Sequence, residues 1–246
     1  MSKKILKRLI TLCALIFTLS VILPMNTNAN EIQNEGITEQ EYISFLKNYS
    51  IEDANKGGIT EEDVVVDAVS DAKNVLAQFN SLTADEKSIF LEVLGNIDIQ
   101  KAIISGNIEG LDSKIKNSIE ITESIDDLED TIGVNASSRT VQGTGTLWVL
   151  GIKITQYVIK GTYEYNSSRV TKILRTQAYV SRNFNPTVVT DLSNKDHYIN
   201  NNRYYGDAVF SFKIGGLGIG VIQLGNAYLG VQGSNKGKYS GYFYTR

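Results

Sequence analysis

Residues whose types could support catalysis are few in this sequence and widely spaced. The 246 residues include a single histidine, His197, and a single cysteine, Cys13. A catalytic histidine needs a nucleophile and an orienting acid close in space, and zinc or disulfide sites need several cysteines or histidines. We therefore expect His197 to lie in an exposed loop, and we expect neither a metal site nor a cofactor.

Acidic residues are equally sparse in the second part of the chain. After residue 139 there are only four: Glu164, Asp191, Asp196 and Asp207. Two carboxylates at a suitable separation can hydrolyse a glycosidic bond, but nothing in this spacing singles out a pair. We therefore expect a protein that is not an enzyme. An enzyme held inactive by a pro-region would need a cleft that contains His197 or such a pair.

Two glycine-containing segments match ligand-binding loops only in part. Residues 53–59 begin like a calcium loop, but Gly57 stands at the fifth position and Val64 at the twelfth, where carboxylates are required. We therefore predict a turn here, before a helix that starts near Thr60. Residues 215–221 are rich in glycine, but their spacing fits neither the Walker nor the dinucleotide fingerprint.

The glycine-rich segment 215–221 has two interpretations. Glycine allows close backbone packing, so the segment can be a tightly packed strand or bend. Residues 217–231 also carry no charge, so the alternative is a flexible apolar segment that enters a membrane. The candidate membrane segment consists of Leu217, Gly218, Ile219, Gly220, Val221 and Ile222.

The first 29 residues have the pattern of a secretory signal peptide. Basic residues at positions 3–8 precede an uncharged, mostly apolar run over 9–23, and a small-residue cleavage pattern ends at Ala29. The apolar run is shorter than the roughly 20 residues of a membrane-spanning helix. Cleavage after Ala29 would remove Cys13, so we expect a secreted, thiol-free protein that is released rather than anchored.

Charge divides the rest of the chain into an acidic part and a basic part. Residues 30–138 contain 7 Lys and Arg against 23 Asp and Glu, a net charge of −16. Residues 139–246 contain 13 Lys and Arg against 4 Asp and Glu, a net charge of +9, and they hold 11 of the 13 tyrosines. Opposite charges attract at low ionic strength, so we expect intramolecular contact between the two parts.

The acidic part has the pattern of helices. Capping-box spacing starts at Thr38 and again at Thr83, and apolar residues recur at helical intervals over residues 60–80. Another apolar group ends at Gly95. We predict four or five short helices, which form an acidic domain or pro-region over residues 30–133. The last amphipathic stretch is formed by Ile121, Ile125, Leu128 and Ile132.

The basic part has the pattern of β-strands. Residues 134–140 are small and polar, which is typical of a linker. Beyond them, apolar and polar residues alternate with a period of two, and turn signals separate six or seven strands. The expected fold class is therefore α+β: an acidic helical region, followed by a basic, Gly- and Tyr-rich antiparallel β-sandwich or barrel over residues 141–246.

The tyrosines of the basic part also have two interpretations. They can pack across strands inside the fold, or they can form an exposed aromatic face beside Lys and Arg. Such a face would suit a glycan, a cell wall or a membrane interface. We do not expect nucleic acid as a partner, because such targets are scarce outside the cell. The candidate surface-binding residues are Lys213, Lys236, Lys238, Tyr239, Tyr242 and Tyr244.

Together these features favour a secreted bacteriocin-like protein or toxin. The basic β domain would act on the bacterial membrane or a cell-wall polymer, and the acidic helical region would shield it until cleavage. Arg139, in the predicted linker, is the candidate processing site. In layout, the chain resembles large secreted bacteriocins of the geobacillin type, which implies an antimicrobial activity. The alternative is a non-catalytic cell-wall or glycan-binding β-sandwich with a row of exposed tyrosines on one sheet face.

Overall fold

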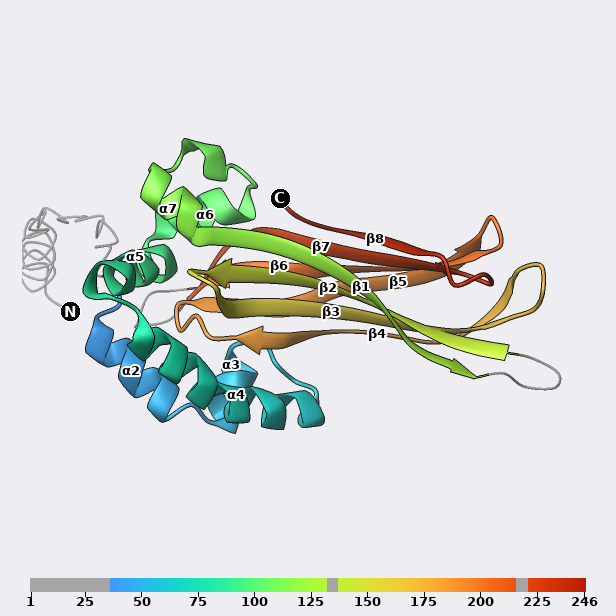
Figure 1. Cartoon of the computed structure of the whole chain (residues 1–246), viewed down its shortest axis with the longest axis horizontal. Helices are drawn as coiled ribbons and strands as arrows, with labels where there is room; N and C mark the ends of the chain where they lie inside the picture. The colour runs from blue at the N-terminus through green and yellow to red at the C-terminus, as the bar shows by residue number, and fades with distance from the viewer. Residues whose placement is uncertain (1–35, 132–136, 216–220) are drawn as a thin grey trace, which may run out of the picture. The chain divides into compact units, whose positions relative to one another are not determined.

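The computed structural model describes residues 36–131, 137–215 and 221–246, which belong to one compact unit. Helices occupy the first part of this unit and strands the second (Figure 1). The helices are α2 (Glu39–Lys47), α3 (Ile51–Lys56), α4 (Glu62–Ser81), α5 (Ala84–Gly95), α6 (Ile97–Ile104), the 3-10 helix η1 (Ile108–Gly110) and α7 (Ser113–Ser118). The strands are β1 (Ile119–Thr131), β2 (Ser137–Val149), β3 (Ile152–Tyr165), β4 (Val170–Asn183), β5 (Val188–Asn200), β6 (Arg203–Ile214), β7 (Ile222–Ser234) and β8 (Tyr239–Thr245).

Most of the described helices begin where a side chain satisfies free backbone N–H groups, although α4 and η1 lack such a cap. Thr38 starts α2 and Thr83 starts α5, each in a complete capping box, which confirms both predicted helix starts. A third capping box joins Ser50 to Asp53 at the start of α3. Asp53 therefore caps a helix, and the turn that we predicted near it comes later, after Lys56, where Gly58 has a φ of +97°.

The last amphipathic stretch of the acidic part is a strand and not the helix that we expected. Its residues Ile121, Ile125 and Leu128 belong to β1, which pairs with β2 in antiparallel register, with Ile119 opposite Val149, whereas Ile132 lies outside the described residues. Ile121 and Ile125 are four residues apart, and this spacing fits one face of a strand as well as a helix. The pairing with β2 along the strand shows that the stretch follows the two-residue period of a strand and not the 3.6-residue period of a helix. The strands therefore begin at Ile119, before the predicted boundary at residue 133.

The expected linker over residues 134–140 is wrong where the structure describes it. Residues 137–140 belong to β2, where Arg139 pairs with Tyr163 and Thr140 with Thr162 of β3. The Oγ1 atoms of the two threonines are 2.9 Å apart and share a hydrogen bond. A run of small polar residues forms a strand here because each of them pairs with a residue of β3 across the sheet.

The strands form two four-stranded antiparallel sheets with simple topology. The strand orders are β1-β2-β3-β4 and β5-β6-β7-β8, so every neighbour in a sheet is also the next strand in the sequence. Hairpins connect the strands within each sheet, and residues 184–187 connect β4 to β5. We call this connection the crossover.

The two sheets face each other and contribute to the same hydrophobic core. The ring of Tyr163 on β3 stacks on that of Tyr204 on β6, with 5.3 Å between their centroids. Glycines make room for these rings, because a Cβ atom at Gly161 of β3 would collide with Tyr204 and one at Gly233 of β7 would collide with Tyr163. Rings of each sheet thus occupy the space that glycines leave in the other sheet.

The helices join this core at the crossover. The Tyr42 hydroxyl of α2 donates a hydrogen bond to the carbonyl of Phe184, at 3.2 Å. The side chains of Asn185 and Thr187 donate to the carbonyl of Leu94 at the end of α5, at 3.3 and 2.9 Å. Buried residues of the helices and of both sheets form one cluster, so the described helices do not form a separate domain.

The fit between glycine and ring predicts a large effect of a single methyl group. We expect Gly161→Ala to lower the free energy of unfolding by about 1–3 kcal/mol, because the new Cβ overlaps the buried Tyr204 ring. Gly110→Ala is the control, since nothing lies within 4 Å of a Cβ at that position. Urea denaturation of both variants measures the difference. Equal midpoints would contradict the close approach of the sheets.

Burial of tyrosines predicts that the fold loses stability in alkali. Burial raises the pKa of Tyr204 to about 12, although a hydrogen bond with Thr176 opposes the rise. In the unfolded chain a tyrosine has a pKa of about 10 and releases its proton first. The stabilising contribution of Tyr204 is therefore complete below about pH 10 and is lost as the pH rises towards 12. Urea unfolding at several pH values from about 9 to 11.5 measures this decline, and the decline should be shallower in Tyr204→Phe.

Candidate functional site

Five tyrosines lie on the outer face of the β5–β8 sheet. We call this surface the tyrosine face, and it comprises Tyr198 of β5, Tyr205 of β6, Tyr228 of β7, and Tyr242 and Tyr244 of β8. Side chains alternate between the faces of a strand, so Phe243, which packs against Tyr157 inside the core, places its two neighbours on the outside. The register places Tyr198 opposite Tyr205 and Tyr228 opposite Tyr244.

The rings of the tyrosine face hold each other in place. Tyr198 and Tyr205 stack with 5.0 Å between centroids, and Tyr228 and Tyr244 stack with 4.9 Å. Tyr242 contacts Tyr244 at 5.6 Å. Tyr198, Tyr242 and Tyr244 nevertheless remain 42%, 40% and 49% exposed. The surface is therefore an aromatic platform that is packed within itself and open to solvent.

A hollow of about 300 Å³ lies in this platform. Its floor is formed partly by Gly230 of β7, where a Cβ atom would collide with the ring of Tyr242. The missing side chain lets Tyr242 reach across β7, and its hydroxyl donates a hydrogen bond to Oδ1 of Asp207 on β6 at 2.8 Å. The side chains that line the hollow are those of Tyr198, Tyr205, Asp207, Gln232, Ser240 and Tyr242.

The hollow has a negative electrostatic character. Burial raises the pKa of Tyr242, and both the hydrogen bond to Asp207 and the charge of that carboxylate raise it further. Burial and then the charge of Asp207 also raise the pKa of Tyr198. Asp196 of β5 lies directly opposite Asp207 in the register. Among the described residues that line the hollow there is no lysine or arginine.

The predicted surface-binding residues are only partly brought together. Tyr242 and Tyr244 lie on the tyrosine face, whereas Lys236 and Lys238 are exposed in the turn between β7 and β8. The other two have partners elsewhere: Lys213 Nζ lies 2.6 Å from Asp191 Oδ2, and the hydroxyl of Tyr239 donates to Asp127.

Sequence reasoning missed most of the tyrosine face. Tyr198, Tyr228 and Asp207 were not expected at the site, and Tyr205 was not distinguished from its buried neighbour Tyr204. For the residues of β5 and β6, the sequence signal is the turn at Asn201 and Asn202, both of which have positive φ and close the β5–β6 hairpin. Counting outwards from that turn would place Tyr198 opposite Tyr205.

Arg139 is buried within β2, and its predicted role as an accessible processing site is wrong for this folded chain. The residue is 8% exposed. Its Nη1 donates to the carbonyl of Ser234 at 3.1 Å, and its guanidinium lies 4.6 Å from the Tyr165 ring centroid. Arg139 Nε also lies 4.0 Å from Asp127 Oδ2. A polar sequence was mistaken for a linker because its polar groups find partners only in the folded sheets.

The remaining sequence candidates lie apart from the tyrosine face or beyond the described residues. His197 is exposed on β5 and pairs with Gly206 in the register, so it lies in a strand and not in the expected loop. Val221 and Ile222 are 64% and 44% exposed at the start of β7. Ala29, Leu217, Gly218, Ile219 and Gly220 lie outside the described residues.

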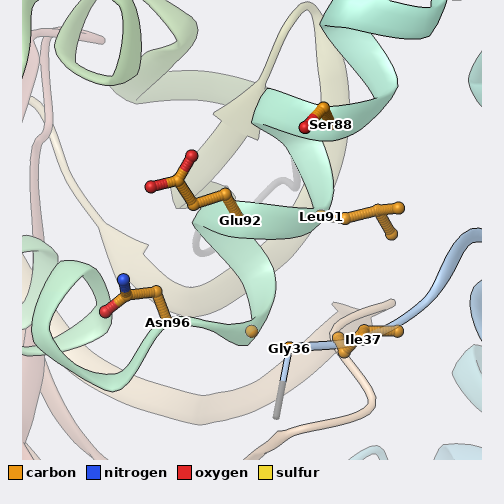
Figure 2. A pocket seen from close by; sticks show the side chains of 7 residues that line it. Gly36, Ile37, Ser88, Leu91, Glu92 and Asn96 are labelled. Atoms are coloured by element: carbon orange, nitrogen blue, oxygen red, sulfur yellow. The ribbon is translucent and has the colours of Figure 1, made fainter. Parts of the chain in front are cut away.

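A second hollow, also of about 300 Å³, lies beside α5. Figure 2 shows Glu92 and Asn96 pointing to one side of it, with Leu91 and Ile37 on the other. Asn96 already accepts hydrogen bonds from the backbone at the start of α6. Since no aromatic side chain lines this hollow among the described residues, we take the tyrosine face as the candidate site.

Comparison of the chain with protein-family models, curated proteins and solved structures finds no match. In the part of the chain that the structure describes, no helix is both long and apolar enough to cross a membrane. The same part contains no cluster of three or more His, Cys, Asp or Glu side chains that could hold a metal ion. The function of the tyrosine face has to be inferred from its own residues.

The burial of Arg139 predicts a structural role that can be measured. We expect Arg139→Gln to lower the free energy of unfolding by about 1–3 kcal/mol, because the carbonyl of Ser234 and the Asp127 carboxylate lose a charged partner. Arg169→Gln, in the exposed β3–β4 turn, is the control, with an expected change within about 0.5 kcal/mol. Urea denaturation measures both. A stable Arg139→Gln protein that merely resists trypsin would restore the processing role.

Proposed function

We propose that this chain is a secreted bacterial protein that binds a cell-wall polymer or another glycan, without catalysis, through the tyrosine face. In this proposal the two facing sheets form a β-sandwich that serves as a rigid platform. The observation that carries the proposal is the gathering of five tyrosines on one outer sheet face, three of which line a hollow.

The chemistry of sugars suits such a surface. A sugar ring has apolar C–H faces, which pack against aromatic rings, and hydroxyls, which need hydrogen-bond partners. Tyrosine offers both a flat apolar ring and a polar hydroxyl, and Asp207, Gln232 and Ser240 add acceptors and donors inside the hollow. The stacked pairs are already ordered, so binding loses little side-chain entropy.

The size of the surface suits a polymer rather than an isolated small molecule. The hollow of about 300 Å³ is at the small end of ligand sites, so it can hold a single unit. Tyr228 and Tyr244 extend the platform beyond the residues that line the hollow. Neighbouring units of the same polymer can pack on this second pair, which adds affinity through several weak contacts.

A bacteriocin-like activity on cell envelopes is the second candidate function. It is favoured by the exposure of Val221 and Ile222, which continue the uncharged candidate membrane segment. Its shielding step finds less support, because the helices share the core with the sheets and Tyr198, Tyr242 and Tyr244 are exposed in their presence. In either function we propose that the helical region supports the sheets and is not removed.

Sedimentation with insoluble peptidoglycan and with chitin tests the primary proposal. We expect Tyr198→Ala and Tyr242→Ala each to weaken binding about tenfold or more, because each removes a ring that lines the hollow. Tyr179→Ala is the matched control, since Tyr179 lies on β4 in the other sheet, and it should bind like the wild type. Circular dichroism checks that all variants are folded. Unchanged binding in both face variants, or no binding by the wild type, would refute the proposal.

A further inference from the structure

The hollow of the tyrosine face combines aromatic walls with a carboxylate. Tyr198, Tyr205 and Tyr242 come from three different strands and all line it. Asp207 lies among them, and the Tyr242 hydroxyl orients its Oδ1 atom through the hydrogen bond at 2.8 Å. That bond uses only one oxygen of the carboxylate, so the group keeps acceptor capacity for a ligand.

The charges around the hollow reinforce this pattern. Asp196 lies opposite Asp207 on the neighbouring strand and adds a second negative charge. The nearest basic residue along β6 on the same face is Arg203, two positions before Tyr205 and towards the turn, and it does not line the hollow. The hollow is therefore negative although it belongs to the part of the chain with a net charge of +9.

Aromatic rings around a carboxylate are suited to a positive charge. The face of an aromatic ring attracts a cation within about 6 Å of its centroid, and cages of such rings recognise ammonium groups. A neutral sugar would use the rings but would leave the two negative charges of Asp207 and Asp196 without a counter-charge.

We propose that the hollow of the tyrosine face binds an ammonium group carried by its ligand. This inference rests on the proposed function for its site and adds the charge of the group that is bound there. Two sources supply this chemistry in polymers of the cell envelope: a quaternary ammonium such as that of choline, and the protonated amine of a sugar without its N-acetyl group. Asp207 provides the counter-charge, and Tyr198, Tyr205 and Tyr242 provide the cation–π contacts.

Calorimetric titration of the purified protein with matched pairs of probes tests this inference. Choline is compared with 3,3-dimethyl-1-butanol, which has a similar shape and no charge. Chitosan oligomers, which carry free amines, are compared with N-acetylated oligomers of the same length. We expect the charged member of at least one pair to bind about tenfold more tightly or better, and the pair concerned identifies the source of the ammonium group.

Two variants with equal changes in net charge show where the preference comes from. Asp207→Asn keeps the size and the acceptor of the side chain but removes its charge, so we expect it to abolish the preference for the charged probes. Glu164→Gln removes one negative charge from β3, in the other sheet, and should leave the preference intact. Circular dichroism confirms that both variants are folded.

The possible outcomes separate this inference from the function on which it rests. Loss of the charge preference in Asp207→Asn alone supports the ammonium site. Equal binding of charged and neutral probes, unaffected by Asp207→Asn, overturns the ammonium site and leaves glycan binding in place. If no probe binds and the wild type also fails to sediment with peptidoglycan and chitin, both are wrong.

Discussion

The fit between glycines of one sheet and aromatic rings of the other is the constraint on which the structure depends. Tyr204 of β6 occupies the space above Gly161 of β3, and Tyr163 of β3 occupies the space above Gly233 of β7. A Cβ at either glycine would separate the sheets, and smaller side chains in place of the rings would leave cavities. These two glycines and two tyrosines therefore have one shared structural reason.

This constraint also determines which tyrosines are available on the surface. Neighbouring residues of a strand point to opposite faces, so the inward ring of Tyr204 places Tyr205 outside, and the inward ring of Phe243 places Tyr242 and Tyr244 outside. A shift of register by one residue would exchange the two sets. The packing of the core and the composition of the tyrosine face are thus two results of the same register.

Local patterns in the sequence predicted the elements that depend on neighbouring residues. The capping boxes were sufficient to predict the helix starts at Thr38 and Thr83, and the apolar group that stops at Gly95 was sufficient to predict a helix end there. The alternation of apolar and polar residues was sufficient to predict strands in the second part of the chain. Long-range partners determined what sequence reasoning missed. The spacing of Ile121 and Ile125 fits a helix as well as a strand, and only the pairing with β2 shows that it is a strand. Arg139 is a buried strand residue only because Ser234 and Asp127 lie beside it. The contact of Tyr242 with Asp207 likewise joins residues 35 positions apart.

The hydrogen bonds at the crossover have a consequence for the order in which the chain folds. Each sheet consists of strands that follow one another directly, so each can form from one continuous stretch of chain. The helices are synthesised before both sheets, yet Tyr42 and Leu94 bind carbonyl and side-chain groups of the crossover, which is made 142 and 91 residues later. The apolar faces of the helices therefore stay without their final partners until most of the chain has been made.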